Sequence, residues 1–435
     1  MRLAATAVAL MTLAATAACG GNGSGSSSSD AKTLTYWASN QSPSLADDKK
    51  NLAPVLKKFQ QQTGIKVNLQ VIGWPDLYSK ILAATTSGKG PDVLNIGNTW
   101  AASLEATGAF LPFGDKEFSA IGGKDKFVEA SLKTGGVPGK PPTSVPYLGL
   151  AYGLYYNKKM FSDAGLQPPK TWEELVSDAK KLTSPSKGVY GMAMEGGSYT
   201  EGVHFAFIFG QQHGADPFDS SGKPDFTSQG MIDGVKQYVD LMGTDKVVNP
   251  SSAQYKNGPE APGDFAKGKA AMLMSQNNAD NTLQADGMKT SEYGVVPIPA
   301  PSNAPSDTAS FVAGINLSIF NNTKNKDGAL KFVKFMTSKQ TQATLDKPFT
   351  ALPVIKGGTV NFTDNPAEAQ AFQSVLQNRS VPLPLVPAEA AYETNVGNAV
   401  NSLVAQAATG KPVTDSDVKA ALQEAQQKMA TSGGS

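Results

Sequence analysis

The chain has 435 residues, of which 40% are hydrophobic and 17% are charged, a composition typical of a globular protein too long for one ordinary core. Its 38 Lys and Arg residues nearly balance its 37 Asp and Glu residues, so the net charge of +1 provides no field that would attract nucleic acid. The only arginines are Arg2 and Arg379, which leaves few side chains for a bidentate clamp on phosphate or carboxylate. Composition therefore argues against nucleic acids and anionic metabolites as ligands.

The first 18 residues have the pattern of an export signal. Arg2 precedes a run rich in Ala, Leu and Val, and the run ends in the small residues Ala17 and Ala18. The run is too short and too rich in alanine for a membrane span. We therefore expect residues 1–18 to be a cleaved signal peptide and the protein to be exported.

Cys19, the only cysteine of the chain, directly follows this cleavage site. Its position resembles that of the acylated cysteine of bacterial lipoproteins, although Thr16 stands where that motif usually has leucine. A Gly- and Ser-rich stretch follows, so residues 19–30 predict a flexible tether. We expect a lipid on Cys19 to anchor the protein to the outer face of the cell membrane, the alternative being secretion with a free thiol.

Strand and helix patterns alternate after the tether. Strands are predicted at 34–37, 65–72 and 93–96, with helices at 46–62 and 75–87. This order is typical of an α/β protein with a parallel sheet. Ligands of such sheets gather beyond the carboxyl ends of the strands. Those ends contain Asn40 and Gln41, Trp74, and the run Asn98, Thr99 and Trp100.

Residues 114–146 are rich in Gly, Pro and Lys, and we interpret them as a crossing into a second lobe. Further strands are predicted near 190–194, 293–298 and 311–320, the segment 265–274 is expected to lead into another, and helices are predicted at 199–213 and 229–242. Helices beginning at Asp327, Pro366, Ala388 and Asp415 are expected to complete the second lobe.

Residues 152–182 show the densest local order. Tyr152, Leu154 and Tyr156 alternate with other side chains as in a strand, and a short helix from 158 to 164 ends at Gly165. Thr171 then predicts the N-cap of another helix, with Glu174 completing a capping box.

Four segments in this order resemble one known family. They are PDVLNIG (91–97), YYNKKMF…AGL…PPKTWEEL (155–175), DFAKGKAAM (264–272) and FVAGINLSIF running into ALKFVKFMTSKQTQATL (311–345). They resemble the solute-binding proteins of bacterial sugar ABC importers, including those of the maltose-binding type. The resemblance covers nearly all of the chain beyond the tether.

The resemblance implies a two-lobed fold of the type II periplasmic-binding-protein kind, with three crossings between the lobes. Residues 31–113 and 271–318 would form lobe 1, and residues 114–270 and 319–435 would form lobe 2. A monomer of this kind captures a neutral mono- or oligosaccharide in the cleft and delivers it to permease subunits in the membrane. An exported glycan-processing enzyme and a carbohydrate sensor or adhesion module remain as alternatives.

Motifs for catalysis or metal binding are absent from the sequence. There is no G-x-S-x-G, H-E-x-x-H, C-x-x-C or Walker loop. His204 and His213 are the only histidines, and the acidic loop at 216–225 departs from the EF-hand pattern. We therefore expect a binding protein with no cofactor and no metal, although the sequence cannot reveal a pair of carboxylates that meet only in space.

Sugar sites need aromatic platforms beside amides or carboxylates, because sugars present flat C–H faces ringed by hydroxyl groups. The predicted platforms are Trp74, Trp100, Tyr147, Tyr152 and Tyr199, and for each the alternative is a place in the core.

The resemblance also implies that the turn after Met272 lines the ligand, which adds Gln276, Asn277, Asn278 and Asp280. Asn278 and Glu393 stand where the maltose-type family has tryptophan-containing segments, which argues against plain maltodextrin binding. Gly314, in the strand at 311–320, completes the predicted set.

Overall fold

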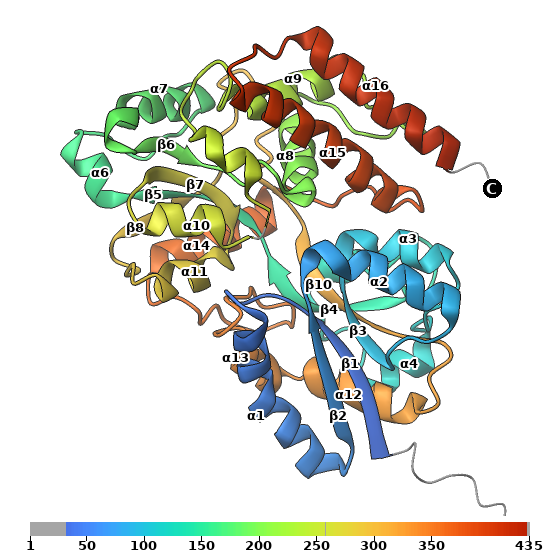
Figure 1. The fold of residues 1–435 in the computed structure, drawn as a ribbon. Helices are drawn as coiled ribbons and strands as arrows, with labels where there is room; N and C mark the ends of the chain where they lie inside the picture. The colour runs from blue at the N-terminus through green and yellow to red at the C-terminus, as the bar shows by residue number, and fades with distance from the viewer. Residues whose placement is uncertain (1–31, 257, 433–435) are drawn as a thin grey trace, which may run out of the picture.

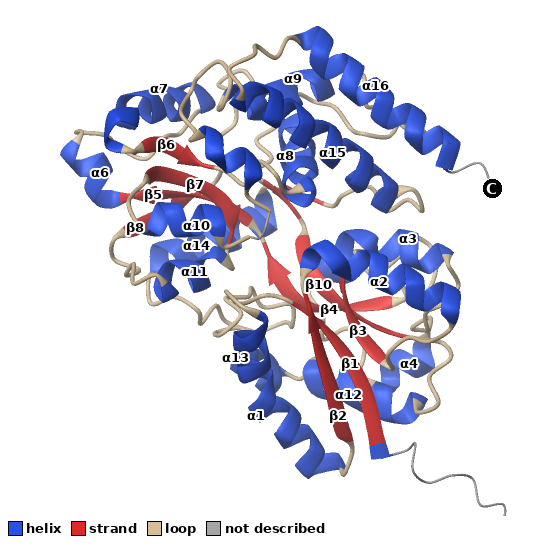
Figure 2. Ribbon diagram, in the orientation of Figure 1, coloured by secondary structure: helices blue, strands red, loops and turns tan. Residues whose placement is uncertain are grey.

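The computed structural model describes residues 32–256 and 258–432, which form two lobes, each built around its own sheet (Figure 1). Figure 2 shows helices packed around both sheets, so the predicted α/β fold is confirmed. The predicted signal peptide, Cys19 and the tether lie outside the described residues. Within the described part, no helix is long and apolar enough to cross a membrane.

Lobe 1 contains a five-stranded sheet in the order β2-β1-β3-β10-β4. Its strands are β1 (Thr33–Ser39), β2 (Lys66–Ile72), β3 (Val93–Gly97), β4 (Ser144–Leu150) and β10 (Ala313–Ile319). As predicted, β1 pairs in parallel with β2 and with β3, whereas β10 runs antiparallel to β3 and β4. The carboxyl ends of β1, β2 and β3 therefore lie at one edge of the sheet.

Eight helical segments accompany this sheet. They are α1 (Leu45–Thr63), α2 (Trp74–Ser87), the 3₁₀ segment η2 (Asn98–Trp100), α3 (Ala101–Ala106), α4 (Asp115–Ala120), α5 (Glu129–Lys133), α12 (Lys326–Met336) and α13 (Lys339–Leu345). Helix α1 starts after Ser44, whose side chain accepts a hydrogen bond from Asp47 N, and ends at Gly64, whose φ of 72° favours glycine. These caps fix where helix α1 begins and ends.

Lobe 2 contains a four-stranded sheet in the order β6-β7-β5-β8. Its strands are β5 (Tyr152–Asn157), β6 (Tyr190–Ala193), β7 (Ala270–Gln276) and β8 (Tyr293–Val296). A small two-stranded sheet pairs β9 (Ser310–Phe311) with β11 (Ser380–Val381).

Eleven helical segments surround the second sheet. They are α6 (Lys158–Asp163), α7 (Trp172–Leu182), η3 (Pro185–Lys187), α8 (Tyr199–Gln212), α9 (Gln229–Asp240), η4 (Pro250–Gln254), α10 (Glu260–Ala266), α11 (Ala279–Ala285), α14 (Pro366–Asn378), α15 (Glu389–Ala408) and α16 (Asp415–Ser432). Thr171 caps α7 as predicted, because its hydroxyl accepts a hydrogen bond from Glu174 N. Helix α15 approaches α8 closely at Gly397, where a Cβ atom would lie 2.1 Å from Tyr199 O.

The expected position of the first crossing was wrong. Residues 114–146 were interpreted as a passage into lobe 2, yet they contain α4 and α5, and β4 pairs with β10 in the sheet of lobe 1. Every residue of β4 is buried, so the Gly- and Pro-rich stretch before it connects elements of one lobe. The chain leaves lobe 1 at Ala151, between β4 and β5.

The assignment of residues 271–318 to lobe 1 was wrong for β7, β8 and α11, which belong to lobe 2, and the assignment of all residues after 318 to lobe 2 was also wrong. Helices α12 and α13 pack in lobe 1, where Phe332 lies 5.0 Å from Tyr36 and 5.1 Å from Phe59 between ring centroids. An amphipathic pattern predicts that a helix buries one face but does not say which sheet it covers. The chain returns to lobe 1 between β9 and β10, and it re-enters lobe 2 between α13 and α14.

Candidate functional site

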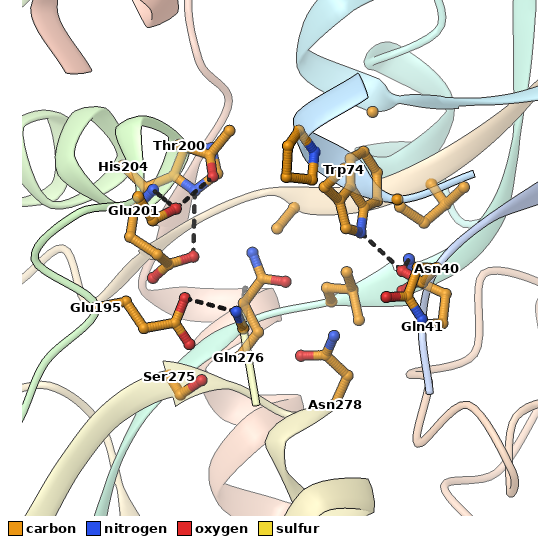
Figure 3. A pocket seen from close by; sticks show the side chains of 18 of the residues that line it. Asn40, Gln41, Trp74, Glu195, Thr200, Glu201, His204, Ser275, Gln276 and Asn278 are labelled. Atoms are coloured by element: carbon orange, nitrogen blue, oxygen red, sulfur yellow. Dashed lines mark hydrogen bonds and ion pairs between the residues drawn. The ribbon is translucent and has the colours of Figure 1, made fainter. Parts of the chain in front are cut away.

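A cavity of about 470 Å³ lies between the lobes (Figure 3). Lobe 1 contributes the ends of β1 and β3, the start of α2 and part of β10. Lobe 2 contributes the turn between β6 and α8, the turn between β7 and α11, and one residue of α15. The carboxyl ends of the parallel strands therefore border the cavity, as their topology predicted.

The loop after β1 is held by a buried carboxylate. Asp48 of α1 is fully buried and accepts hydrogen bonds from Asn40 Nδ2 at 2.6 Å and from Gln41 N at 3.1 Å. It also accepts one from Ser42 N at 3.0 Å. Burial raises the pKa of Asp48, and these donors oppose that rise. The Asn40 and Gln41 segment is therefore fixed before any ligand binds.

Trp74 is the most accessible aromatic platform. Its ring is half-buried, and its Nε1–H donates to the carbonyl of Asn40 at 2.7 Å, which fixes the indole at the cavity wall (Figure 3). Trp100 lies behind it with 5.5 Å between ring centroids, and Tyr78 lies 5.0 Å from Trp100. Trp100 is only 3% exposed, so it lines the cavity and also belongs to the core of lobe 1.

Asn98 and Thr99 line the cavity, but the side chain of Asn98 has a structural partner. Its Nδ2 donates to Val312 O at 2.7 Å, and the residue is 3% exposed. This hydrogen bond joins η2 to the segment that enters β10. Gly314 of β10 also lines the cavity. A Cβ atom at this position would lie 2.7 Å from Leu148 O, so the backbone approach requires glycine.

The wall contributed by lobe 2 is acidic. Glu195 follows β6, and Glu201 and His204 lie in the first turns of α8; Figure 3 shows them facing the cavity beside Gln276. Glu195 accepts a hydrogen bond from Gly258 N at 3.1 Å, and Glu201 accepts one from the Tyr152 hydroxyl at 2.7 Å. The same hydroxyl lies 2.8 Å from His204 Nδ1.

These two glutamates share a site that disfavours two negative charges. Burial raises the pKa of Glu195 well above its usual range, and the nearby carboxyl of Glu201 raises it further. Burial raises the pKa of Glu201 too, although His204 opposes the rise. The pair can therefore both donate and accept hydrogen bonds, which suits hydroxyl groups that do the same.

Glu393 of α15 reaches across to lobe 1. Its Oε2 accepts a hydrogen bond from Trp100 Nε1 at 2.6 Å, and its Oε1 lies 3.7 Å from His204 Nε2. Burial raises the pKa of Glu393, but the adjacent His204, together with Thr99 and Glu389, holds the pKa below its usual range. The side chain is 1% exposed and therefore forms part of a contact between the lobes.

Of the predicted site residues, ten line the cavity and five do not. The ten are Asn40, Gln41, Trp74, Asn98, Thr99, Trp100, Gln276, Asn278, Gly314 and Glu393. The five that lie elsewhere are Tyr147, Tyr152, Tyr199, Asn277 and Asp280.

The three tyrosines are displaced from the cavity by their places in the core or behind the wall. Tyr147 is 1% exposed, packs inside lobe 1 and has its pKa raised by burial. Tyr152 lies behind Glu201, to which its hydroxyl donates. Tyr199 is half-buried at the start of α8, where its backbone lies against Gly397 of α15. Sequence alternation alone does not reveal which face of a strand meets the cleft.

Asn277 and Asp280 have structural partners instead. The Oδ1 of Asn277 accepts a hydrogen bond from Ala151 N at 2.7 Å, and its Nδ2 donates to Thr350 O. It therefore ties together two of the chain segments that cross between the lobes. Asp280 is fully buried, and its pKa is raised by burial and then by the neighbouring Glu368.

Glu195, Glu201 and His204 were missed by the sequence reasoning. A signal for them existed, because a strand was predicted near 190–194 and a helix from 199 onward. Applying the strand-end rule to β6 would have indicated Glu195. Among the described residues, no cluster of three or more His, Cys, Asp and Glu side chains is placed to hold a metal ion.

Comparisons with known proteins agree with this geometry. Residues 42–343 match the model of the family described as bacterial extracellular solute-binding protein. The diacetylchitobiose binding protein DasA of Streptomyces coelicolor is 24% identical over 408 residues, which cover 88% of this chain and 87% of that protein.

Two solved structures share the fold. A solute-binding protein of Thermotoga lettingae, bound with α-D-tagatose, has a TM-score of 0.79 at 23% identity and aligns with 92% of this chain and 100% of its own. A solute-binding protein of Agrobacterium radiobacter K84, in complex with ribitol, has a TM-score of 0.77 at 25% identity and aligns with 92% of this chain and 99% of its own. The predicted two-lobed fold is thereby confirmed.

Proposed function

The chain belongs to the bacterial extracellular solute-binding protein family, and from this premise we propose that it captures a neutral mono- or oligosaccharide between its lobes for an ABC importer. The observation that carries this proposal is the composition of the cavity wall. An aromatic platform, Trp74, faces a wall of carboxyl and amide groups contributed by Glu195, Glu201 and Gln276. Stacking and hydrogen bonding from opposite sides is the combination that a sugar ring requires.

The charged groups of the wall agree with a neutral ligand. Arg379, the only arginine among the described residues, pairs with Asp307 at 3.1 Å and does not line the cavity. Among the described residues, Lys256 is the only Lys or Arg that lines the cavity, so the lining offers no cluster of positive charge to an anionic ligand. The relatives described above are named for, or bound to, neutral polyhydroxylated compounds, namely diacetylchitobiose, tagatose and ribitol.

Isothermal titration against a panel of monosaccharides, polyols and short oligosaccharides tests the proposal, with amino acids as the control ligands. We expect one-to-one binding of a sugar or polyol, with the ligand recovered unchanged by chromatography. Recovery of a cleaved product would support the alternative of a glycan-processing enzyme. Binding of amino acids in place of sugars would contradict the proposed ligand class.

Delivery to permease subunits separates an importer component from a sensor or adhesion module. We expect deletion of the gene to abolish uptake of the bound sugar by the host, and the wild-type chain to restore it. Unchanged uptake with loss of a sugar-dependent response would favour the sensor. We propose that the protein acts as a monomer and without a cofactor. Sedimentation of the purified protein tests the first point, and full sugar binding after dialysis would support the second.

Anchoring through Cys19 is part of the same proposal, because a receptor that serves a membrane permease works best when held beside it. Acyl chains contribute roughly 0.8 kcal/mol per buried methylene, so more than one chain gives a stable anchor. We expect Cys19→Ala to move the protein from the membrane fraction to the medium or the soluble exported fraction. Unchanged partitioning in the native host would contradict the lipid anchor.

A further inference from the structure

We propose that the contact between Trp100 and Glu393 closes one end of the cleft, so that the site accepts one or two sugar rings and excludes longer chains. This inference rests on the proposed function and makes it more specific, because it assigns the size class of the ligand and the residues that set it. It concerns a wall between the lobes.

The two residues of this wall belong to different lobes. Trp100 ends η2 in lobe 1, whereas Glu393 lies on α15, which packs along α8 in lobe 2. Their side chains are joined by a hydrogen bond of 2.6 Å, and they are 3% and 1% exposed. Both residues also line the cavity, so this contact forms part of its wall.

A second contact reinforces the closure one turn earlier on α15. Ala390 N donates to Ser103 Oγ of α3 at 3.0 Å. Ala390 is 3% exposed and belongs to the apolar cluster of lobe 1 that contains Trp100 and Leu104. The first turns of α15 therefore rest on lobe 1 through both polar and apolar contacts.

The wall is supported on its other sides as well. Trp100 packs edge-on against Trp74 at 5.5 Å and against Tyr78 at 5.0 Å between ring centroids. On the lobe 2 side, Glu393 lies 3.7 Å from His204, which in turn contacts the Tyr152 hydroxyl at 2.8 Å. A wall fixed by packed rings and by a chain of polar contacts does not yield easily to a longer ligand.

The size of the cavity agrees with a closed end. Its volume of about 470 Å³ lies in the lower half of the roughly 300–1,000 Å³ that is usual for small-molecule sites. The lining opens to solvent at exposed residues such as Leu45, which is 40% exposed, Pro75 and Lys256, whereas Trp100 and Glu393 at the wall are buried. A ligand would therefore enter from that side and place its terminal ring against Trp74 and Glu201.

The test is a titration of the whole protein with linear oligomers of increasing length, from monosaccharide to hexasaccharide. The series are α-1,4-linked glucose, β-1,4-linked glucose and β-1,4-linked N-acetylglucosamine. For the series that binds, we expect the affinity to be greatest for one or two rings and to fall by at least about tenfold on adding a third.

Two variants at one position then test whether the wall causes this preference. Glu393→Ala removes the side chain that meets Trp100. In this variant we expect the affinity to fall by less than about threefold when a third ring is added. Glu393→Gln is the matched control, because an amide oxygen still accepts from Trp100 Nε1 and fills the same space. We expect it to keep the wild-type preference for short chains.

The outcomes are distinguishable. Equal or rising affinity from two to six rings in the wild type overturns the inference while leaving the proposed function in place. Failure of every sugar to bind overturns the proposed function, and with it the inference. Circular dichroism identifies a Glu393→Ala protein that does not fold, and in that case the wild-type series decides the question alone.

Discussion

The two walls of the cleft differ in how their polar groups are used. On lobe 1, Asn40 and Gln41 bond to Asp48, and Asn98 bonds to the backbone of Val312. On lobe 2, the carboxyls of Glu195 and Glu201 and the amide of Asn278 face the cavity (Figure 3). Lobe 1 thus presents a preformed surface with an aromatic ring, whereas lobe 2 presents carboxyl and amide groups to the cavity. Each prediction below would change one wall and leave the other intact.

The largest effect is expected at Trp100, which belongs to the wall and to the core of lobe 1. Replacing a buried aromatic side chain with alanine costs about 3–5 kcal/mol, so we expect Trp100→Ala to lower the free energy of unfolding of the ligand-free protein by about 3 kcal/mol or more. Denaturant unfolding of the purified variant measures this. An unfolding midpoint equal to that of the wild type would show that Trp100 is not a core residue.

Trp74→Ala should affect binding more than stability, because the ring is half-buried and faces the cavity. Loss of a stacked apolar surface at about 25 cal/mol per Å² corresponds to roughly 2 kcal/mol, or more than tenfold in affinity. Titration with the sugar identified in the panel measures the loss. Retained affinity would mean that the platform lies elsewhere on lobe 1.

Glu195→Gln tests the acidic wall through pH. Because the folded-state pKa of Glu195 is raised above its unfolded value, the folded protein holds more protons between those two values. The stability that Glu195 contributes therefore falls as the pH rises through this window. Glutamine cannot ionise, so its contribution in Glu195→Gln does not change with pH.

We expect the melting temperature of the wild type to decrease from about pH 5 to about pH 8 more steeply than that of Glu195→Gln. Differential scanning calorimetry across this range makes the comparison. Glu174→Gln, on an exposed helix start far from the cavity, is the control and should follow the wild type. Parallel curves for the wild type and Glu195→Gln would contradict the proposed environment of the carboxyl.

The smallest effects distinguish two asparagines that look alike in the sequence. Asn278→Ala removes an amide that faces the cavity, and we expect it to weaken sugar binding by about 0.5–1.5 kcal/mol with little change in stability. Asn98→Ala removes the donor to Val312 O, and we expect it to lower stability by about 1–3 kcal/mol, because a buried carbonyl then lacks that hydrogen bond. Thermal unfolding and titration of both variants check these assignments. A loss of stability in Asn278→Ala together with a loss of affinity in Asn98→Ala would contradict them.

The sequence predicted most elements because their signals are local. The caps at Ser44 and Thr171 and the alternation of strands with helices are readable over a few residues. The strand-end rule then placed Asn40, Trp74 and Trp100 beside the cavity.

What the sequence could not predict depends on long-range packing. Trp100 and Glu393 are 293 positions apart, and only the folded chain brings them together. Helix α12 has an ordinary amphipathic pattern that fits either sheet, which is why its lobe was misassigned. Tyr147 and Tyr152 were predicted as aromatic platforms, yet both are buried within their strands.

The position of β10 has a consequence for how the protein comes to be folded. This strand lies between β3 and β4, although it is made more than 160 residues after β4 ends (313 − 150 = 163). Until it has left the ribosome, β3 and β4 each lack a neighbour, and the sheet of lobe 1 cannot close. Contacts so distant along the chain form slowly. A chain still in synthesis can therefore pair β1 with β2 and β3, but the sheet of lobe 1 is completed only after β10 has been made.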